Sequence, residues 1–274
     1  MQHATFRTRA SRPGNRPLFV LLAVLLLACP GAPLQASDFS PNEVSSQQTV
    51  ELYQNIPGLT SEQLAFGQTA IRKMNYNSQR IFRKICAMPG TNFQQAQSAI
   101  EVLQRERFTF AQVQSYEAFA DLPGMDVQTG MGGLQTVKEL SYVSARAFRN
   151  YAGVEGVNAK QALSIIPVVD KMDEIRCKAA EAMFAVKGMR VETAHKGLST
   201  LSRLRDNQAK AAETFARIAD MDPETMLSGM EIIARIGPDN AWNARCLFTN
   251  PEVSAKGAWN WLTGYFVLPT EAQE

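Results

Sequence analysis

Histidine is almost absent from this chain of 274 residues, which contains only His3 and His195. The metal and haem motifs HExxH, CxxC and CxxCH do not occur either, and this excludes the enzyme and metal-site classes that they define. A serine hydrolase triad would have to use one of these two histidines. We therefore expect neither a cofactor nor a bound metal, and the sequence gives little support to an enzyme.

Long apolar runs are also scarce, and the one that is present lies near the N-terminus. Leu18–Ala28 has eleven residues, which is too short to span a bilayer comfortably. Basic residues precede it, Pro30 and Gly31 follow it, and Ala36 offers a small side chain for cleavage. This order is typical of a secretory signal peptide. We expect residues 1–36 to be removed and the mature protein to be periplasmic or secreted, in a bacterial cell envelope.

A second processing site is also compatible with this segment. The tetrapeptide that ends at Cys29, Leu-Leu-Ala-Cys, resembles a bacterial lipobox. Cleavage before Cys29 would leave a lipid-anchored protein, whereas cleavage after Ala36 would not.

The charge of the whole chain depends on this leader. Residues 1–36 contain four arginines and no acidic residue, so their removal changes the formal net charge from +2 (28 basic, 26 acidic) to −2 (24 basic, 26 acidic). The basic character therefore gives no indication of a nucleic-acid partner. No second apolar run long enough to cross a bilayer follows, so we expect no membrane span after processing.

Similar stretches recur with a period of about 32 residues, which is in the range of known helical repeats. "GMDVQTGMGGLQTV" begins at Gly124, "GMRVETAHKGLSTL" begins at Gly188, and a related stretch begins at Gly156. Apolar residues spaced by three and four predict one amphipathic helix in each unit. A later apolar set predicts a second helix, which ends at Gly or Pro. Each helical hairpin is too small to bury its own apolar face, so the hairpins are expected to stack.

The pattern predicts an all-α solenoid of about six repeats over residues 58–251, with a half repeat at each end. A linker and a capping helix are expected over 37–57, with the helix near Glu43–Asn55. A final helix is expected near Ser254–Phe266, within a cap and tail over 252–274. Three residues are placed as helix N-caps: Thr60, Asn158 and Asp222.

Small residues recur at two positions of the unit. They are Gly67, Gly133, Gly197 and Gly229 in the first helix, and Ala145 and Ala209 in the second. With Pro57 and Pro123 at unit boundaries, the chain resembles tetratricopeptide repeats, in which a Gly and an Ala twelve positions apart let two helices approach closely. The resemblance implies a right-handed superhelix whose concave groove binds peptides or protein segments.

Two other functions stay open at this point. A hydrolase would use His195, but the equivalent positions of other units hold Met131, Leu163 and Leu227, which favours a packed histidine. A helical carrier of a small apolar ligand or lipid would use the methionines. Four of them fall on predicted core positions, which favours packing: Met172, Met183, Met226 and Met230.

The stretch "GAWNWLTGYFVLP" places aromatic residues on two faces of the final helix. Because Trp and Tyr often anchor interfaces, these residues are candidates for binding a partner or a second copy of the chain: Trp259, Trp261, Tyr265 and Phe266. The sequence thus favours an envelope adaptor or scaffold that binds a protein or peptide. The remaining cysteines fall in separate repeats, so we expect three free thiols: Cys86, Cys177 and Cys246.

Overall fold

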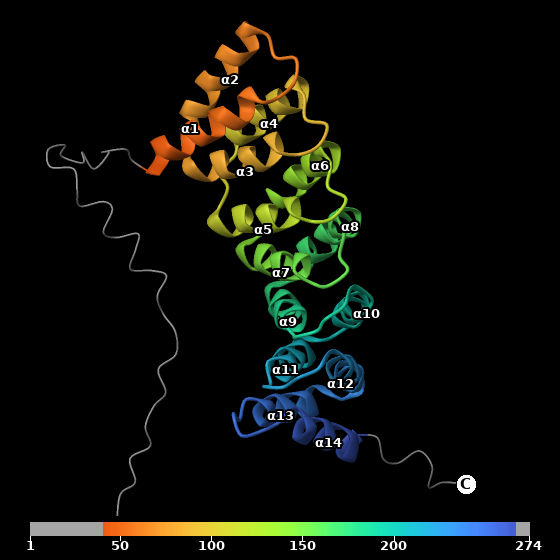
Figure 1. Ribbon diagram of the computed structural model, residues 1–274. Coiled ribbons are helices and arrows are strands. Elements are labelled where there is room, and N and C mark those ends of the chain that lie inside the picture. Colours follow the sequence, from red (N-terminus) through yellow and green to blue (C-terminus); the bar gives the residue numbers. More distant parts are fainter. Residues whose placement is uncertain (1–40, 267–274) are drawn as a thin grey trace, which may run out of the picture. The chain divides into compact units, whose positions relative to one another are not determined.

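The computed structural model describes residues 41–266, and their side chains from 45 to 264. The predicted leader (1–36), the lipidation candidate Cys29 and the tail after residue 266 lie outside this range. Fourteen α-helices make up the regular structure of residues 41–266, which contain no β-strand (Figure 1). The helices are α1 (Pro41–Gln54), α2 (Ser61–Lys73), α3 (Tyr76–Cys86), α4 (Phe93–Arg105), α5 (Phe110–Ala120), α6 (Val127–Val137), α7 (Tyr142–Ala152), α8 (Ala159–Asp170), α9 (Glu174–Phe184), α10 (Val191–Leu201), α11 (Asp206–Ala216), α12 (Pro223–Arg235), α13 (Pro238–Phe248) and α14 (Ala255–Phe266).

Side-chain caps fix the starts of most of these helices. Thr60 and Asn158 form capping boxes with Gln63 and Gln161, and the Asp222 carboxylate accepts bonds from two backbone amides of α12. The three predicted N-caps are therefore confirmed. Helices also occupy the two ends where single helices were expected, as α1 and α14.

Each odd-numbered helix is joined to the next even-numbered helix by a six-residue loop. We call such a pair a hairpin, from α1–α2 to α13–α14. In the first five hairpins the loop contains a glycine with φ between 76° and 86°: Gly58, Gly90, Gly124, Gly156 and Gly188. This left-handed conformation costs glycine little, and it lets the chain turn tightly after the odd helix.

Successive hairpins pack side by side, so that odd helices contact odd helices and even helices contact even helices. Figure 1 shows the two rows clearly from α5 onward. The odd helices pack against one another more extensively than the even helices do, and α8 and α10 have little contact. Each odd helix also packs on the even helix of its own hairpin.

The close glycine contacts occur within these hairpins. A Cβ added to Gly133 would lie 2.0 Å from the ring of Phe119 on α5, and one added to Gly197 would lie 2.2 Å from Sδ of Met183 on α9. The sequence led us to expect contact with the following helix, which carries Ala145 or Ala209. This prediction was wrong, because each glycine faces the preceding helix. Gly67 and Gly229 meet Tyr53 and Phe215 in the same way.

Buried polar side chains tie the two helices of a hairpin together. Gln112 on α5 donates from Nε2 to the carbonyls of Lys138 (2.8 Å) and Leu140 (2.9 Å), which follow the last residue of α6. Gln208 on α11 donates in the same way to the carbonyls of Ala234 (3.1 Å) and Ile236 (2.8 Å) at the end of α12. Since a buried carbonyl without a donor is costly, these bonds fix how the odd helix meets the end of the even helix in its own hairpin.

Backbone bonds between loops link successive hairpins in the middle of the chain. The amides of Val127, Ala159 and Val191 donate to the carbonyls of Pro89, Pro123 and Glu155 in the preceding loops. At the next equivalent position the residue is Pro223, which has no N–H to give to the Lys187 carbonyl. The series of loop-to-loop bonds therefore stops there.

The cysteines agree with the expectation of free thiols. Cys86, Cys177 and Cys246 form no disulfide within the described residues. Cys177 is buried and its Sγ lies 3.5 Å from the Val169 carbonyl, as suits a small core residue. Burial raises the pKa of Cys86 to about 12, so this thiol is neutral at ordinary pH.

Candidate functional site

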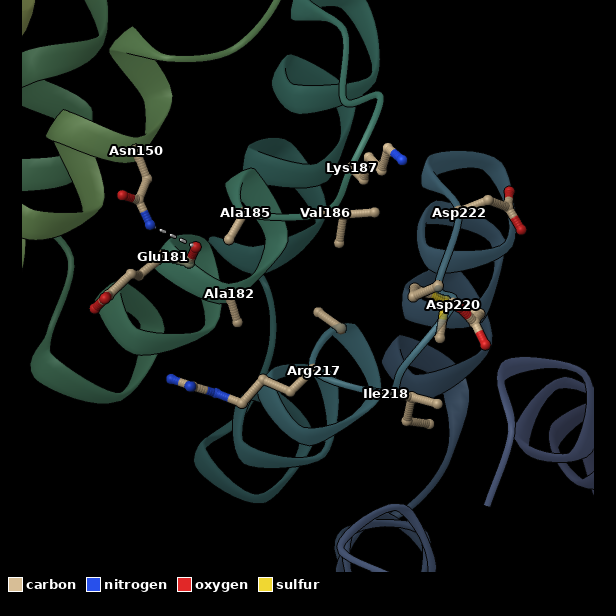
Figure 2. Close-up of a pocket in the computed structure, with 12 residues that line it drawn as sticks. Asn150, Glu181, Ala182, Ala185, Val186, Lys187, Arg217, Ile218, Asp220 and Asp222 are labelled. Atoms are coloured by element: carbon tan, nitrogen blue, oxygen red, sulfur yellow. Dashed lines mark hydrogen bonds between the residues drawn. The ribbon is translucent and has the colours of Figure 1, made fainter. Parts of the chain in front are cut away.

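An open pocket of about 660 Å³ lies where the loops after α9 and α11 come together (Figure 2). Its floor is apolar, with Ala182, Val186, Ile218 and Met221 among the lining residues, and charged residues complete the lining: Glu181, Lys187, Arg217, Asp220 and Asp222. Serine, cysteine and histidine are missing from the lining. The pocket can seat a side chain or a small amphipathic group, but its lining offers none of these common nucleophiles.

Most polar groups of the pocket are already bonded to other parts of the protein. Asn150 donates to the Glu181 carbonyl (3.2 Å), and the Glu181 carboxylate pairs with Arg146. Hydrogen bonds from the Thr225 side chain and backbone lower the pKa of Asp222. These groups therefore hold α7, α9 and α12 in position, which suggests a structural role for much of the pocket.

Asp220 stands in this pocket at the loop position that glycine fills in the five preceding hairpins. Its φ is 62°, and it is the one non-glycine residue with positive φ among residues 41–266. Aspartate tolerates this conformation better than most residues, yet it is less favourable than glycine.

Replacing Asp220 with glycine is therefore expected to raise the free energy of unfolding by about 0.5–1 kcal/mol, since the relief of backbone strain exceeds the added chain entropy. Urea denaturation followed by circular dichroism measures the change. The reciprocal variant Gly188→Asp should lose about 1 kcal/mol, because φ is 80° there and a side chain would meet no atom within 4 Å. A loss of stability in Asp220→Gly would contradict this account.

His195 lies on α10 against a fully buried tyrosine. Its Nε2 is 2.6 Å from the Tyr151 hydroxyl, and the two rings stack with centroids 5.8 Å apart. Burial raises the pKa of Tyr151 to about 12, so the hydroxyl stays protonated. Ile165 of α8 occupies the position that is glycine or alanine in α2, α4, α6, α10 and α12, and the Tyr151 ring meets His195 of the next even helix, α10.

This arrangement gives His195 a packing role between hairpins. The bond joins α7 to α10 at the place where α8 and α10 have little contact. Within residues 45–264 no carboxylate bonds to the imidazole and no serine does, so the orienting and nucleophilic partners of a triad are not assembled around it there. Of the four methionines placed on core positions, Met183, Met226 and Met230 are almost fully buried. Met172 is only partly buried and packs against the edge of the core.

The C-terminal candidates are only partly described. Trp261 is half-buried and meets Phe248 edge-on, with centroids 6.0 Å apart. Trp259 is also half-buried. The side chains of Tyr265 and Phe266 lie outside the described range. Trp261 thus contributes to the packing of α14 on α13, which leaves Trp259 as the better candidate for contact with a partner.

A row of aromatic residues on the exposed face of the odd helices was not predicted from the sequence. Tyr76, Phe110 and Tyr142 are the first residues of α3, α5 and α7, and they are 42%, 57% and 61% exposed. We call this row the aromatic ladder. Its signal in the sequence is an aromatic residue directly after the N-caps Asn75, Thr109 and Ser141.

Arginines hold the ladder in place. The Arg80 guanidinium carbon lies 5.8 Å from the Tyr76 centroid and 5.4 Å from the Phe110 centroid, so one side chain bridges these two rings. Arg80 pairs with Glu117 on α5, and Arg146, which lies 5.7 Å from the Tyr142 centroid, pairs with Glu181 on α9. The cation–π contacts hold the rings against the guanidinium groups, and the ion pairs hold the guanidinium groups in place. Together they restrict the rings before any partner binds.

Comparison with protein-family models, curated proteins and solved structures found no match for this chain. Within residues 41–266 no helix is long and apolar enough to cross a membrane. The same residues contain no group of three His, Cys, Asp or Glu side chains placed to hold a metal ion. The candidate sites, namely the pocket and the aromatic ladder, are thus defined by surface geometry alone.

Proposed function

We propose that this protein is a helical-repeat scaffold or adaptor of the bacterial cell envelope, which binds a protein or peptide partner along the exposed face of its odd helices. The observation that carries the proposal is the recurrent packing of odd helix on odd helix from α1 to α13. Such packing produces a long surface with one helix face per hairpin, which suits extended binding.

The difference between the two rows of helices supports this choice of face. A two-layer stack curves toward its more tightly packed layer, and the odd helices are the more tightly packed. The proposed solenoid is therefore concave on the odd side. Concave repeat surfaces surround an extended partner better than convex ones.

Two features count against the alternatives of a lipid carrier and a hydrolase. The methionines that would line an apolar cavity fill the core instead. The imidazole of His195 is engaged by Tyr151 and stacks on its ring. The proposal therefore contains no catalytic step and no nucleic-acid partner.

Site-specific photocross-linking in envelope extract tests the proposed face. A photoreactive residue replaces exposed side chains on odd helices, Lys178 (α9) or Arg245 (α13), and matched exposed side chains on even helices, Ser164 (α8) or Glu231 (α12). We expect one protein adduct from both odd-helix positions and none from the even-helix positions. Equal labelling from both faces, or co-purified lipid without any protein adduct, would overturn the proposal.

A further inference from the structure

The aromatic ladder has a spacing that a particular kind of peptide can match. Neighbouring packed helices have axes about 8–10 Å apart, so side chains at the same position of α3, α5 and α7 repeat at about that distance. The contact of one guanidinium, that of Arg80, with both the Tyr76 and Phe110 rings agrees with this estimate. A polyproline II helix presents the same face every three residues, which is about 9 Å. One ring per turn would then contact the peptide.

We propose that the aromatic ladder is a docking site for a proline-rich segment in the polyproline II conformation. This inference rests on the proposed scaffold function and names the chemistry of its partner. Proline rings are apolar and flat enough to pack on aromatic faces, and aromatic grooves are the usual receptors for such segments. The backbone carbonyls of polyproline II make no internal bonds, and the tyrosine hydroxyls at both ends of the ladder can donate to them.

The surface between the rings argues against an amphipathic helix as the partner. Such a helix places apolar side chains at every turn and needs a continuous apolar groove. Between Tyr76 and Phe110 lies the Arg80 guanidinium instead. A polyproline II segment needs apolar contact only once per turn, so it tolerates a cation between two rings.

The polar groups beside the ladder argue against a glycan, the other polymer that stacks on aromatic rings. Sugars carry hydroxyls that need carboxylate and amide partners. Here the Glu117 and Glu181 carboxylates are paired with Arg80 and Arg146, and the Gln114 side-chain oxygen accepts from Arg149 (2.6 Å). The neighbourhood of the ladder thus offers ring faces rather than free acceptors.

The ladder is also confined to one part of the chain. At the first position of α9, α11 and α13 the residues are Glu174, Asp206 and Pro238. Three rings at one per turn define a docked segment of roughly nine residues, since each turn contains three. A partner segment of this length is expected to be enough for binding.

Fluorescence anisotropy with a labelled peptide of twelve prolines tests the inference on the full chain. We expect saturable binding, and we expect Phe110→Ala, Tyr76→Ala or Tyr142→Ala each to weaken it about tenfold, as truncation of an aromatic anchor does. Phe110→Leu keeps an apolar side chain without the ring and should also weaken binding. Phe66→Ala, which removes an exposed ring from the even helix α2, is the matched control and should bind as the unaltered protein does.

Three results would overturn the inference: no binding of the proline peptide, equal binding by the ladder variants, or ladder-dependent binding of a β-1,4-linked N-acetylglucosamine hexamer in its place. The last result would assign the ladder to a glycan. In each case, protein adducts cross-linked from Lys178 and Arg245 would show that the scaffold function stands while the proline-rich partner fails.

Discussion

Replacing Gly133 with alanine is expected to lower the free energy of unfolding by about 2–3 kcal/mol, although alanine is the better helix former. An added Cβ would lie 2.0 Å from the Phe119 ring, and two further ring atoms would lie within 3 Å. Phe119 is fully buried and also packs on Phe148, with centroids 6.0 Å apart, so its ring has no room to move. The two helices of the hairpin must therefore separate. Guanidinium denaturation of the variant measures the loss.

The neighbouring Gly132 provides the control in the same helix. A Cβ there would meet only Leu163, at an ordinary contact distance of 3.5 Å. Gly132→Ala should therefore gain up to about 1 kcal/mol from helix propensity. Gly197→Ala should fall between the two, because the opposing Met183 side chain is flexible and can adjust. Equal stability of the Gly132 and Gly133 variants would disprove the packing described here.

Loss of the Gln208 side chain should have a comparable effect by a different route. Its Oε1 accepts from the Arg205 amide (2.8 Å), while its Nε2 donates to the carbonyls of Ala234 and Ile236. Gln208→Ala leaves all three backbone groups without this partner at a buried site, which should cost about 2–4 kcal/mol. Because the bonds hold α11 against the end of α12, the cost should appear as a lower denaturation midpoint.

Gln95 allows the capping contribution to be separated from the bonds that join two helices of a hairpin. It forms the same kind of capping bond, to the Asn92 amide (3.2 Å), but its side chain bonds to no other helix within the described residues. Gln95→Ala should therefore cost about 0.5–1 kcal/mol, the lower part of the range for a helix cap. If Gln208→Ala were no worse than Gln95→Ala, the bonds between α11 and the end of α12 would contribute nothing to stability.

The sequence was sufficient to predict helices, their approximate ends and several caps, because these depend on local spacing and on residues such as Thr60 and Asn158. It could not predict which neighbour each helix meets. Gly133 stands at similar separations from Phe119 before it and Ala145 after it, so the spacing alone does not distinguish the two partners. The structure shows that the bulky partner before the glycine is the one in contact.

Parts of the candidate site could not be predicted from the sequence for a similar reason. The 32-residue period identifies positions that recur in most units, whereas the aromatic ladder occurs in only three units. Tyr151 and His195 lie 44 residues apart in the chain, so no local pattern indicates the bond between them. Arg80 and Glu117 likewise lie far apart in the chain, at a separation that no local pattern connects.

The restriction of extensive packing to nearby helices has a consequence for how the chain folds. Each extensive contact joins helices that are at most three apart in order, so the polypeptide closes only short loops as it becomes ordered. Low contact order favours fast folding. Because domains begin to fold as they emerge, the pair α1–α2 and its neighbour α3–α4 can assemble before α13 has been translated. Each folded pair then provides a surface against which the next pair packs.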